Sequence, residues 1–152
     1  MPKQLEYLDA IPEDSELLSL TAFASKKIWG YSDELMLLWK TDLEITKDYI
    51  LQNKVVKVFD ADNFIGYFAV IADEENNAVI DHFWIKPEMI KQNYGREIFS
   101  YVTKYISSSG YKRLTLIAEP NAKRFYEKMG GEITGQFESL ISSRYLEFMN
   151  FQ

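Results

Sequence analysis

The chain has 152 residues, a net charge of −6 at pH 7 and a pI of about 4.9, which argues against nonspecific binding to nucleic acid. It contains no cysteine and a single histidine, which excludes disulfides, thiolate zinc sites, histidine-rich metal sites and an acyl-cysteine intermediate. Its apolar runs are too short for a membrane span, and its first ten residues lack the apolar segment of a secretory signal, so we expect a cytoplasmic protein without a membrane partner.

The first third of the chain reads as helical. Acidic residues after Pro12 suit a helix start, and apolar residues then recur at helical spacing. Ser32 and Thr46 can cap a second and a third helix. The predicted apolar positions of the first helix are Leu17, Leu20, Ala24 and Ile28, and those of the second are Leu35, Leu38 and Trp39.

The middle of the chain changes to a β pattern. Residues 55–59, 64–71 and 78–85 are rich in β-branched and aromatic side chains. Polar segments at 60–63 and 73–77 separate these runs. The spacing predicts an antiparallel meander of three strands.

The last third alternates between helix and strand. One helical face is marked by Ile98, Phe99, Val102 and Ile106. A strand at 113–118, a short helix at 121–129 and strands at 132–137 and 145–151 follow. Because a strand, a crossover helix and a strand form a parallel pair, 78–85 should run parallel to 113–118.

The predicted fold is therefore a single α/β domain over residues 1–152. Its sheet is mixed and mostly antiparallel, with about seven strands and one central parallel pair, and helices flank it. The strand at 145–151 is a candidate sheet edge, where a second copy could add to form a homodimer.

Two segments carry a family resemblance. WIKPEMIKQNYGREIF, residues 84–99, reads as a strand that ends at a proline, a polar loop and a new helix, and NAKRFYEKMGG follows at 121–131. The run from Ile80 to Gly131 resembles the GNAT superfamily of acyl-CoA-dependent N-acetyltransferases. In that family the first segment is a pyrophosphate loop, Arg/Gln-x-x-Gly-x-Gly/Ala, and the second carries an Asn followed by Phe-Tyr-Glu-Lys and Gly.

The loop departs from the family pattern at two positions. Ile90 stands where the family has Arg or Gln, and Asn93 replaces the first principal glycine, so that only Gly95 remains. Asparagine enters left-handed conformations at a penalty of about 1 kcal/mol relative to glycine. Affinity would then fall by about tenfold at most, and we expect the loop to bind the pyrophosphate of CoA. The alternative is a plain connection between strand and helix.

The resemblance implies acetyl-CoA as the acyl donor, without a metal. The cofactor-binding residues that it implies are Phe83, Trp84, Ile85, Lys91, Gln92, Asn93, Tyr94, Gly95, Arg96, Asn121 and Phe125. From its place after Pro120, Asn121 is also expected to cap its helix. Phe125 should face the core, whereas Tyr126 points about a quarter turn away.

The resemblance makes Tyr126 the candidate general acid. A departing thiolate has a conjugate acid with a pKa of about 8.5 and tyrosine a pKa of about 10, so proton donation is feasible. The alternative is a half-buried tyrosine with its hydroxyl in water.

Strand alternation places His82 on one face with Ile80 and Trp84. In the resemblance this strand end receives the amine, so His82 is a candidate general base, with Glu119 and Asp81 as rivals. A satisfied core or cleft histidine is the alternative.

The connection between the first two helices contains Trp29 and Tyr31, in the region that covers the acceptor site in the family. An aromatic wall there would suit an apolar or aromatic amine, with core packing as the alternative for Trp29.

We therefore predict direct transfer of an acetyl group to a primary amine of a small molecule or a peptide, since no cysteine can carry it. One alternative is a CoA-sensing or protein-binding module on the same fold, without turnover. Another is transfer of a different acyl group.

Overall fold

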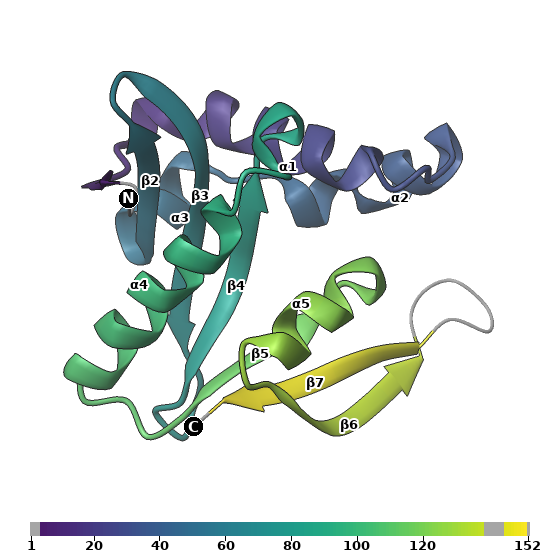
Figure 1. The fold of residues 1–152 in the computed structure, drawn as a ribbon. Helices are drawn as coiled ribbons and strands as arrows, with labels where there is room; N and C mark the ends of the chain where they lie inside the picture. Colours follow the sequence, from purple (N-terminus) through teal and green to yellow (C-terminus); the bar gives the residue numbers. More distant parts are fainter. Residues whose placement is uncertain (1–3, 139–144, 152) are drawn as a thin grey trace. The chain divides into compact units, whose positions relative to one another are not determined.

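The structure, a computed structural model, describes residues 4–138 and 145–151 (Figure 1). The chain divides into two units, each taken here by itself. The first consists of Met1–Ala69 and His82–Ile98, and the second of Val70–Asp81 and Phe99–Gln152. Among the described residues, no helix is both long and apolar enough to span a membrane.

The first unit contains the N-terminal helices and the first strands. Its elements are β1 (Leu5–Asp9), η1 (Pro12–Asp14), α1 (Ser15–Lys27), α2 (Asp33–Leu43), α3 (Lys47–Gln52), β2 (Lys54–Asp60), most of β3 (Asn63–Ala72), the end of β4 (Ala78–Ile85), η2 (Pro87–Met89) and the start of α4 (Tyr94–Ser108). The strand order in this unit is β1-β2-β3-β4. The side chains of Ser32 and Thr46 accept hydrogen bonds from backbone N–H groups three residues on, which confirms both predicted caps.

The second unit contains the parallel pair. It adds β5 (Leu114–Ala118), η3 (Pro120–Ala122), α5 (Lys123–Lys128), β6 (Glu132–Glu138) and β7 (Tyr145–Phe151). The strand order here is β4-β5-β7-β6, and Figure 1 shows β5, β7 and β6 side by side. The β4–β5 ladder is parallel and joins Ala78 to Leu114 and Ile80 to Leu116. The predicted α/β class and the mixed sheet with one parallel pair are confirmed.

The prediction that the chain begins as helix was wrong for β1. Leu5–Asp9 pairs antiparallel with β2, from Leu5 opposite Asp60 to Asp9 opposite Val56. This five-residue strand has two charged side chains and three apolar ones, which is too short a segment for its alternation to stand out.

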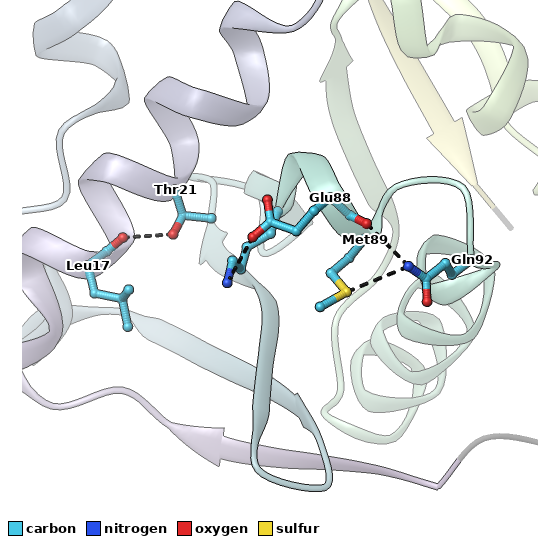
Figure 2. Close-up of polar contacts among 6 residues, drawn as sticks. Leu17, Thr21, Glu88, Met89 and Gln92 are labelled. Atoms are coloured by element: carbon cyan, nitrogen blue, oxygen red, sulfur yellow. Dashed lines mark hydrogen bonds and ion pairs between the residues drawn. The ribbon is translucent and has the colours of Figure 1, made fainter.

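The predicted apolar face of α1 was also wrong. Leu17, Leu20 and Ile28 are 43%, 61% and 45% exposed, and Ala24 is exposed as well. The buried face consists instead of Leu18, Thr21, Ala22 and Ser25, and hydroxyl residues supply half of it. The hydroxyl of Thr21 donates to the carbonyl of Leu17 (Figure 2), and that of Ser25 to the carbonyl of Ile85. These bonds allow two hydroxyl residues to face the core, which hydropathy spacing cannot anticipate.

The predicted sheet edge at 145–151 was wrong too. β7 pairs with β5 on one side and with β6 on the other, so the described strand at this end of the sheet is β6. β6 and β7 are antiparallel neighbours, and the sequence does not reveal which of the two pairs with β5.

The apolar face predicted for α4 is confirmed. Ile98, Phe99, Val102 and Ile106 are each at most 4% exposed. Their spacing of three and four residues aligns them along one side of the helix.

Gly66 of β3 lies against the end of β4. A Cβ at this position would lie 2.1 Å from the carbonyl oxygen of Trp84 and 2.9 Å from the Cα of Ile85. The N–H of Lys86 donates to the carbonyl of Ile65 at 2.8 Å, which holds the backbone after β4 beside β3. Only glycine permits this approach, so Gly66 sets the position of the β4 end from which the loop departs.

Candidate cofactor loop and active-site residues

The connection from β4 to α4 begins as a rigid turn. Pro87 starts η2, where its fixed φ suits the first position of a turn. The chain then passes through a turn at 90–93 and enters α4 at Tyr94. Asn93 has φ +64°, the left-handed conformation for which asparagine was expected to be tolerated. The chain thus reverses without the glycine that the family pattern has here.

The side chain of Gln92 folds back onto η2 (Figure 2). Its Nε2 donates to the carbonyl of Glu88 at 3.2 Å and to the Sδ of Met89 at 3.8 Å. Glu88 pairs with Lys86 at 3.1 Å, and a hydrogen bond from its own backbone, followed by this partner, lowers its pKa. Since the side chain of Gln92 is engaged within the loop, its backbone N–H is the group that it can offer to a ligand.

Two cations flank the start of α4. Lys91 and Arg96 are exposed, and within the described part of the chain neither side chain has a hydrogen bond or an ion pair. The first turn of a helix also presents N–H groups without intrahelical partners and the positive end of the helix dipole. The segment from Lys91 to Arg96 therefore has the charge and the donors that a pyrophosphate requires.

The backbone conformation of Asn93 leads to a stability prediction. Asn93→Val should lower the free energy of unfolding by about 2 kcal/mol, because a β-branched residue is strongly disfavoured at positive φ. Asn93→Gly should change it by less than about 1 kcal/mol. Chemical denaturation measures both variants. Lys91→Val is the matched control at an exposed neighbour, and an equal loss in that variant would contradict backbone strain as the cause.

His82 lies in an aromatic cluster in the first unit. It is 8% exposed, its ring is stacked with Tyr67 at 6.1 Å between centroids, and it meets Tyr49 edge-on at 5.8 Å. The indole Nε1–H of Trp84 donates to its Nδ1 at 3.0 Å, which confirms that both lie on one face of β4. Because Nδ1 accepts this bond, the proton of the neutral ring is on Nε2. This arrangement argues against His82 as the residue that takes up the amine proton. It suits His82 as a hydrogen-bond donor through Nε2.

Asn121 is not the cap of its helix. It lies within η3, the residue before α5 is Ala122, and the amide Nδ2 of Asn121 donates to Oε1 of Glu119 at 2.8 Å. Pro120 starts the 3-10 turn one residue earlier than the predicted cap, which places Asn121 inside the turn. Both Asn121 and Asp81 are exposed, and Glu119 is half-buried.

Tyr126 is more deeply buried than predicted. It is 7% exposed, whereas Phe125, expected in the core, is half-buried. The ring of Tyr126 packs against Phe125, Phe99 and Phe151 at 5.3, 5.9 and 6.3 Å between centroids. Burial, and after it the charge of Glu119, raises the pKa of Tyr126 well above its ordinary value. Its hydroxyl therefore keeps its proton at physiological pH and is a hydrogen-bond donor.

The raised pKa of Tyr126 predicts a loss of stability at alkaline pH. A tyrosine whose pKa is raised on folding stabilises the protein below the unfolded pKa of about 10, and this contribution declines as pH rises above it. The slope of this loss should reach about 1.4 kcal/mol per pH unit for this group above about pH 11, where the unfolded phenol is ionised and the folded one is not. Denaturation at pH 10, 11 and 12 measures the slope. Tyr126→Phe should flatten the slope by that amount, and an unchanged slope would contradict the assignment.

The aromatic residues after α1 divide between surface and interior. Trp29 is 42% exposed, so core packing was the wrong alternative for it. Tyr31 instead meets Trp39 edge-on at 4.8 Å, and Nζ of Lys26 lies 4.2 Å from the Trp39 ring centroid. These contacts fix Tyr31 against α2 and leave Trp29 as the exposed candidate for acceptor contact.

The sequence interpretation missed a groove of about 1070 Å³ between α1 and α2. Charged and apolar side chains line much of it: the carboxylates Glu13, Glu16, Asp33 and Glu44, the lysines Lys40 and Lys47, and the apolar Leu20, Phe23, Met36, Leu37 and Leu43. The signal was the excess of apolar residues on α1, which fill more than one helical face. The residues described contain no group of three or more His, Asp or Glu side chains that could hold a metal ion.

Comparison with solved structures finds known proteins that share this fold. The PaiA N-acetyltransferase of Thermoplasma acidophilum, solved with coenzyme A, has a TM-score of 0.73 at 20% identity, over 97% of this chain and 99% of that one. An N-acetyltransferase of Rhodopseudomonas palustris has a TM-score of 0.78 at 17% identity, over 99% and 96%. A chimera of Vibrio cholerae spermidine N-acetyltransferase and hSSAT has a TM-score of 0.71 at 20% identity, over 98% and 95%.

These likenesses show a shared fold. A comparison with curated proteins found no match. The family model of the acetyltransferase (GNAT) domain matches residues 39–138, about two thirds of the chain, and includes the loop and both segments that carry the resemblance. The chain therefore belongs to the GNAT acetyltransferase family.

Proposed function

We propose that this protein transfers an acetyl group from acetyl-CoA directly to a primary amine of a small molecule or a peptide. The observation that carries the proposal is the loop at 91–96, where a left-handed Asn93 leads into the start of α4 between Lys91 and Arg96, two exposed cations without an ion pair among the described residues. A neighbour of the same fold was solved with coenzyme A.

The cofactor contacts follow from the residues of the loop and of β4. Backbone N–H groups from Lys91 to Arg96 would bind the pyrophosphate, with Gly95 allowing close approach. Backbone groups of Phe83, Trp84 and Ile85 would hold the pantetheine arm and polarise the thioester carbonyl. Asn121 and Phe125 would add contacts to the arm.

The chemical step is attack of the neutral amine on the thioester carbon. A C–N bond forms, the C–S bond breaks, the amine loses one proton and the thiolate of CoA gains one. We assign Tyr126 to the sulfur, where its protonated hydroxyl would stabilise the developing thiolate by donating a hydrogen bond. Glu119 and Asp81 are the carboxylates available to take up the amine proton, directly or through water. His82 would donate from Nε2 and orient a bound group.

The acceptor class is suggested by charge. The chain carries −6, and the groove between α1 and α2 is lined by four carboxylates, Glu13, Glu16, Asp33 and Glu44, against two lysines, Lys40 and Lys47. A neighbour is named as a spermidine N-acetyltransferase. Polyamines and amines with an apolar body are therefore the first acceptors to test, with Trp29 as a candidate contact. We further propose a cytoplasmic location, and a homodimer stays a proposal.

Calorimetric titration tests the proposal first. Acetyl-CoA should bind with micromolar affinity, 3′-dephospho-CoA should retain most of it, and pantetheine, which lacks the pyrophosphate, should bind much more weakly. An amine screen that follows the released thiol then tests transfer. Binding without transfer to any amine would support the CoA-sensing alternative. Preference for a longer acyl chain would identify another donor, and no binding at millimolar acetyl-CoA would overturn the proposal.

A further inference from the structure

Tyr94 differs from its neighbours in the loop. Lys91, Gln92 and Asn93 are exposed, whereas Tyr94, the first residue of α4, is only 6% exposed. Its hydroxyl donates to Oδ2 of Asp60 at 2.6 Å. The sequence resemblance assigned Tyr94 to the cofactor, but the phenol points into the first unit and only its backbone is left for the loop.

The acceptor of this hydrogen bond belongs to the sheet. Asp60 is the last residue of β2 and lies opposite Leu5 in the β1–β2 ladder. The next residue, Ala61, has φ +54° and begins the tight turn to β3. A ladder on one side and a tight turn on the other leave the Asp60 backbone little freedom, so its carboxylate is a fixed point for the phenol.

The bond is of a strong type. A hydroxyl that donates to a carboxylate at this distance makes a charge-assisted hydrogen bond. This bond, with a further contribution from burial, raises the pKa of Tyr94, so the phenol keeps the proton that it donates. The Tyr94–Asp60 hydrogen bond, which tethers the start of α4 to the end of β2, is therefore present throughout the physiological pH range.

We propose that the Tyr94–Asp60 hydrogen bond positions the first turn of α4, so that its N–H groups are fixed for the pyrophosphate in a loop that has only one glycine. This inference rests on the proposed function. Binding an anion to a mobile turn requires ordering of that turn, and a tether present before binding reduces this cost. Tyr94 and Asp60 are positioning residues, because neither side chain needs to touch the ligand.

Three variants separate the tether from its charge. Tyr94→Phe and Asp60→Ala each remove the hydrogen bond, whereas Asp60→Asn keeps an oxygen that accepts from the phenol and removes the charge. Tyr111→Phe, which removes a half-buried phenol elsewhere, is the control. Circular dichroism and thermal unfolding identify any variant that fails to fold.

Affinity for CoA, 3′-dephospho-CoA and pantetheine is measured for each variant by calorimetry, with NMR titration for the weakest ligand. Tyr94→Phe and Asp60→Ala should each weaken both pyrophosphate ligands by about tenfold and leave pantetheine within about twofold. The double variant, Tyr94→Phe with Asp60→Ala, should bind the two pyrophosphate ligands no more weakly than either single variant does. Asp60→Asn and Tyr111→Phe should stay within about twofold of the parent.

The outcomes distinguish the inference from the function on which it rests. If the parent protein binds no CoA, the proposed function fails. If the parent binds CoA and Tyr94→Phe binds it equally well, the positioning role is overturned. Equal weakening of CoA and pantetheine would also overturn it, because a general loss of structure does not select the pyrophosphate.

Discussion

Gly66→Ala should lower the free energy of unfolding by about 3 kcal/mol or more. The new Cβ would lie 2.1 Å from the carbonyl oxygen of Trp84, and the obstacle is backbone, which has no rotamer to change. Either β3 or the end of β4 must move, and the hydrogen bond from Lys86 to Ile65 would be strained. Urea denaturation of the variant measures the loss.

Gly110→Ala is the control for this prediction. Gly110 has φ +83°, and a Cβ there would have no heavy atom within 4 Å, so alanine at this position has backbone strain without a clash. Its expected cost is about 1 kcal/mol. A Gly66→Ala variant no less stable than Gly110→Ala would contradict the close approach. Affinity for acetyl-CoA should fall as well, because Trp84 and Ile85 are proposed to hold the pantetheine arm.

Tyr126→Phe should lower kcat for acetyl transfer by about 10²-fold or more and leave the affinity for acetyl-CoA within about twofold. Phenylalanine keeps the ring that packs against Phe99 and Phe151, and it removes the hydroxyl proposed to stabilise the thiolate. Steady-state release of the thiol, with the best acceptor of the amine screen, measures kcat, and calorimetry measures affinity.

Tyr111→Phe is the matched control and should keep the parent kcat. A kcat of Tyr126→Phe within about threefold of the parent would exclude the hydroxyl from the chemical step. A parallel loss of kcat and of affinity would instead indicate that Tyr126 acts through packing of the second unit.

The sequence predicted best what depends on strong periodicity and on specific capping residues. Buried residues on α4 recur at every third or fourth position, and Ser32 and Thr46 precede their helices as good caps do. The order of strand, helix and strand was enough for the parallel pair of β4 and β5. The burial of Thr21 and Ser25 on α1 could not be predicted, because their partners are backbone carbonyls that only the folded chain brings near.

The candidate site also contains features that the sequence predicts and features that it does not. The turn between β4 and α4 was predictable because its residues are consecutive, and the left-handed backbone at Asn93 follows from the residue type. The hydrogen-bond partners of Tyr94 and His82 could not be predicted. Asp60 is 34 residues from Tyr94 in the chain, and Trp84 on the same strand turns its indole back to His82. Such pairings depend on register and rotamer, which a single sequence does not specify.

The contact at Gly66 also restricts how this sequence can diverge. Neighbours that share the fold differ from this chain at about four positions in five, so most side chains can be exchanged. The atoms that exclude a larger residue at position 66 belong to the backbone of Trp84 and Ile85, so no substitution at those two positions can make room for it. Loss of this glycine would have to be accompanied by an insertion or deletion that shifts the end of β4. A lineage that keeps the strand lengths is therefore expected to keep glycine at position 66, whatever else in its sequence changes.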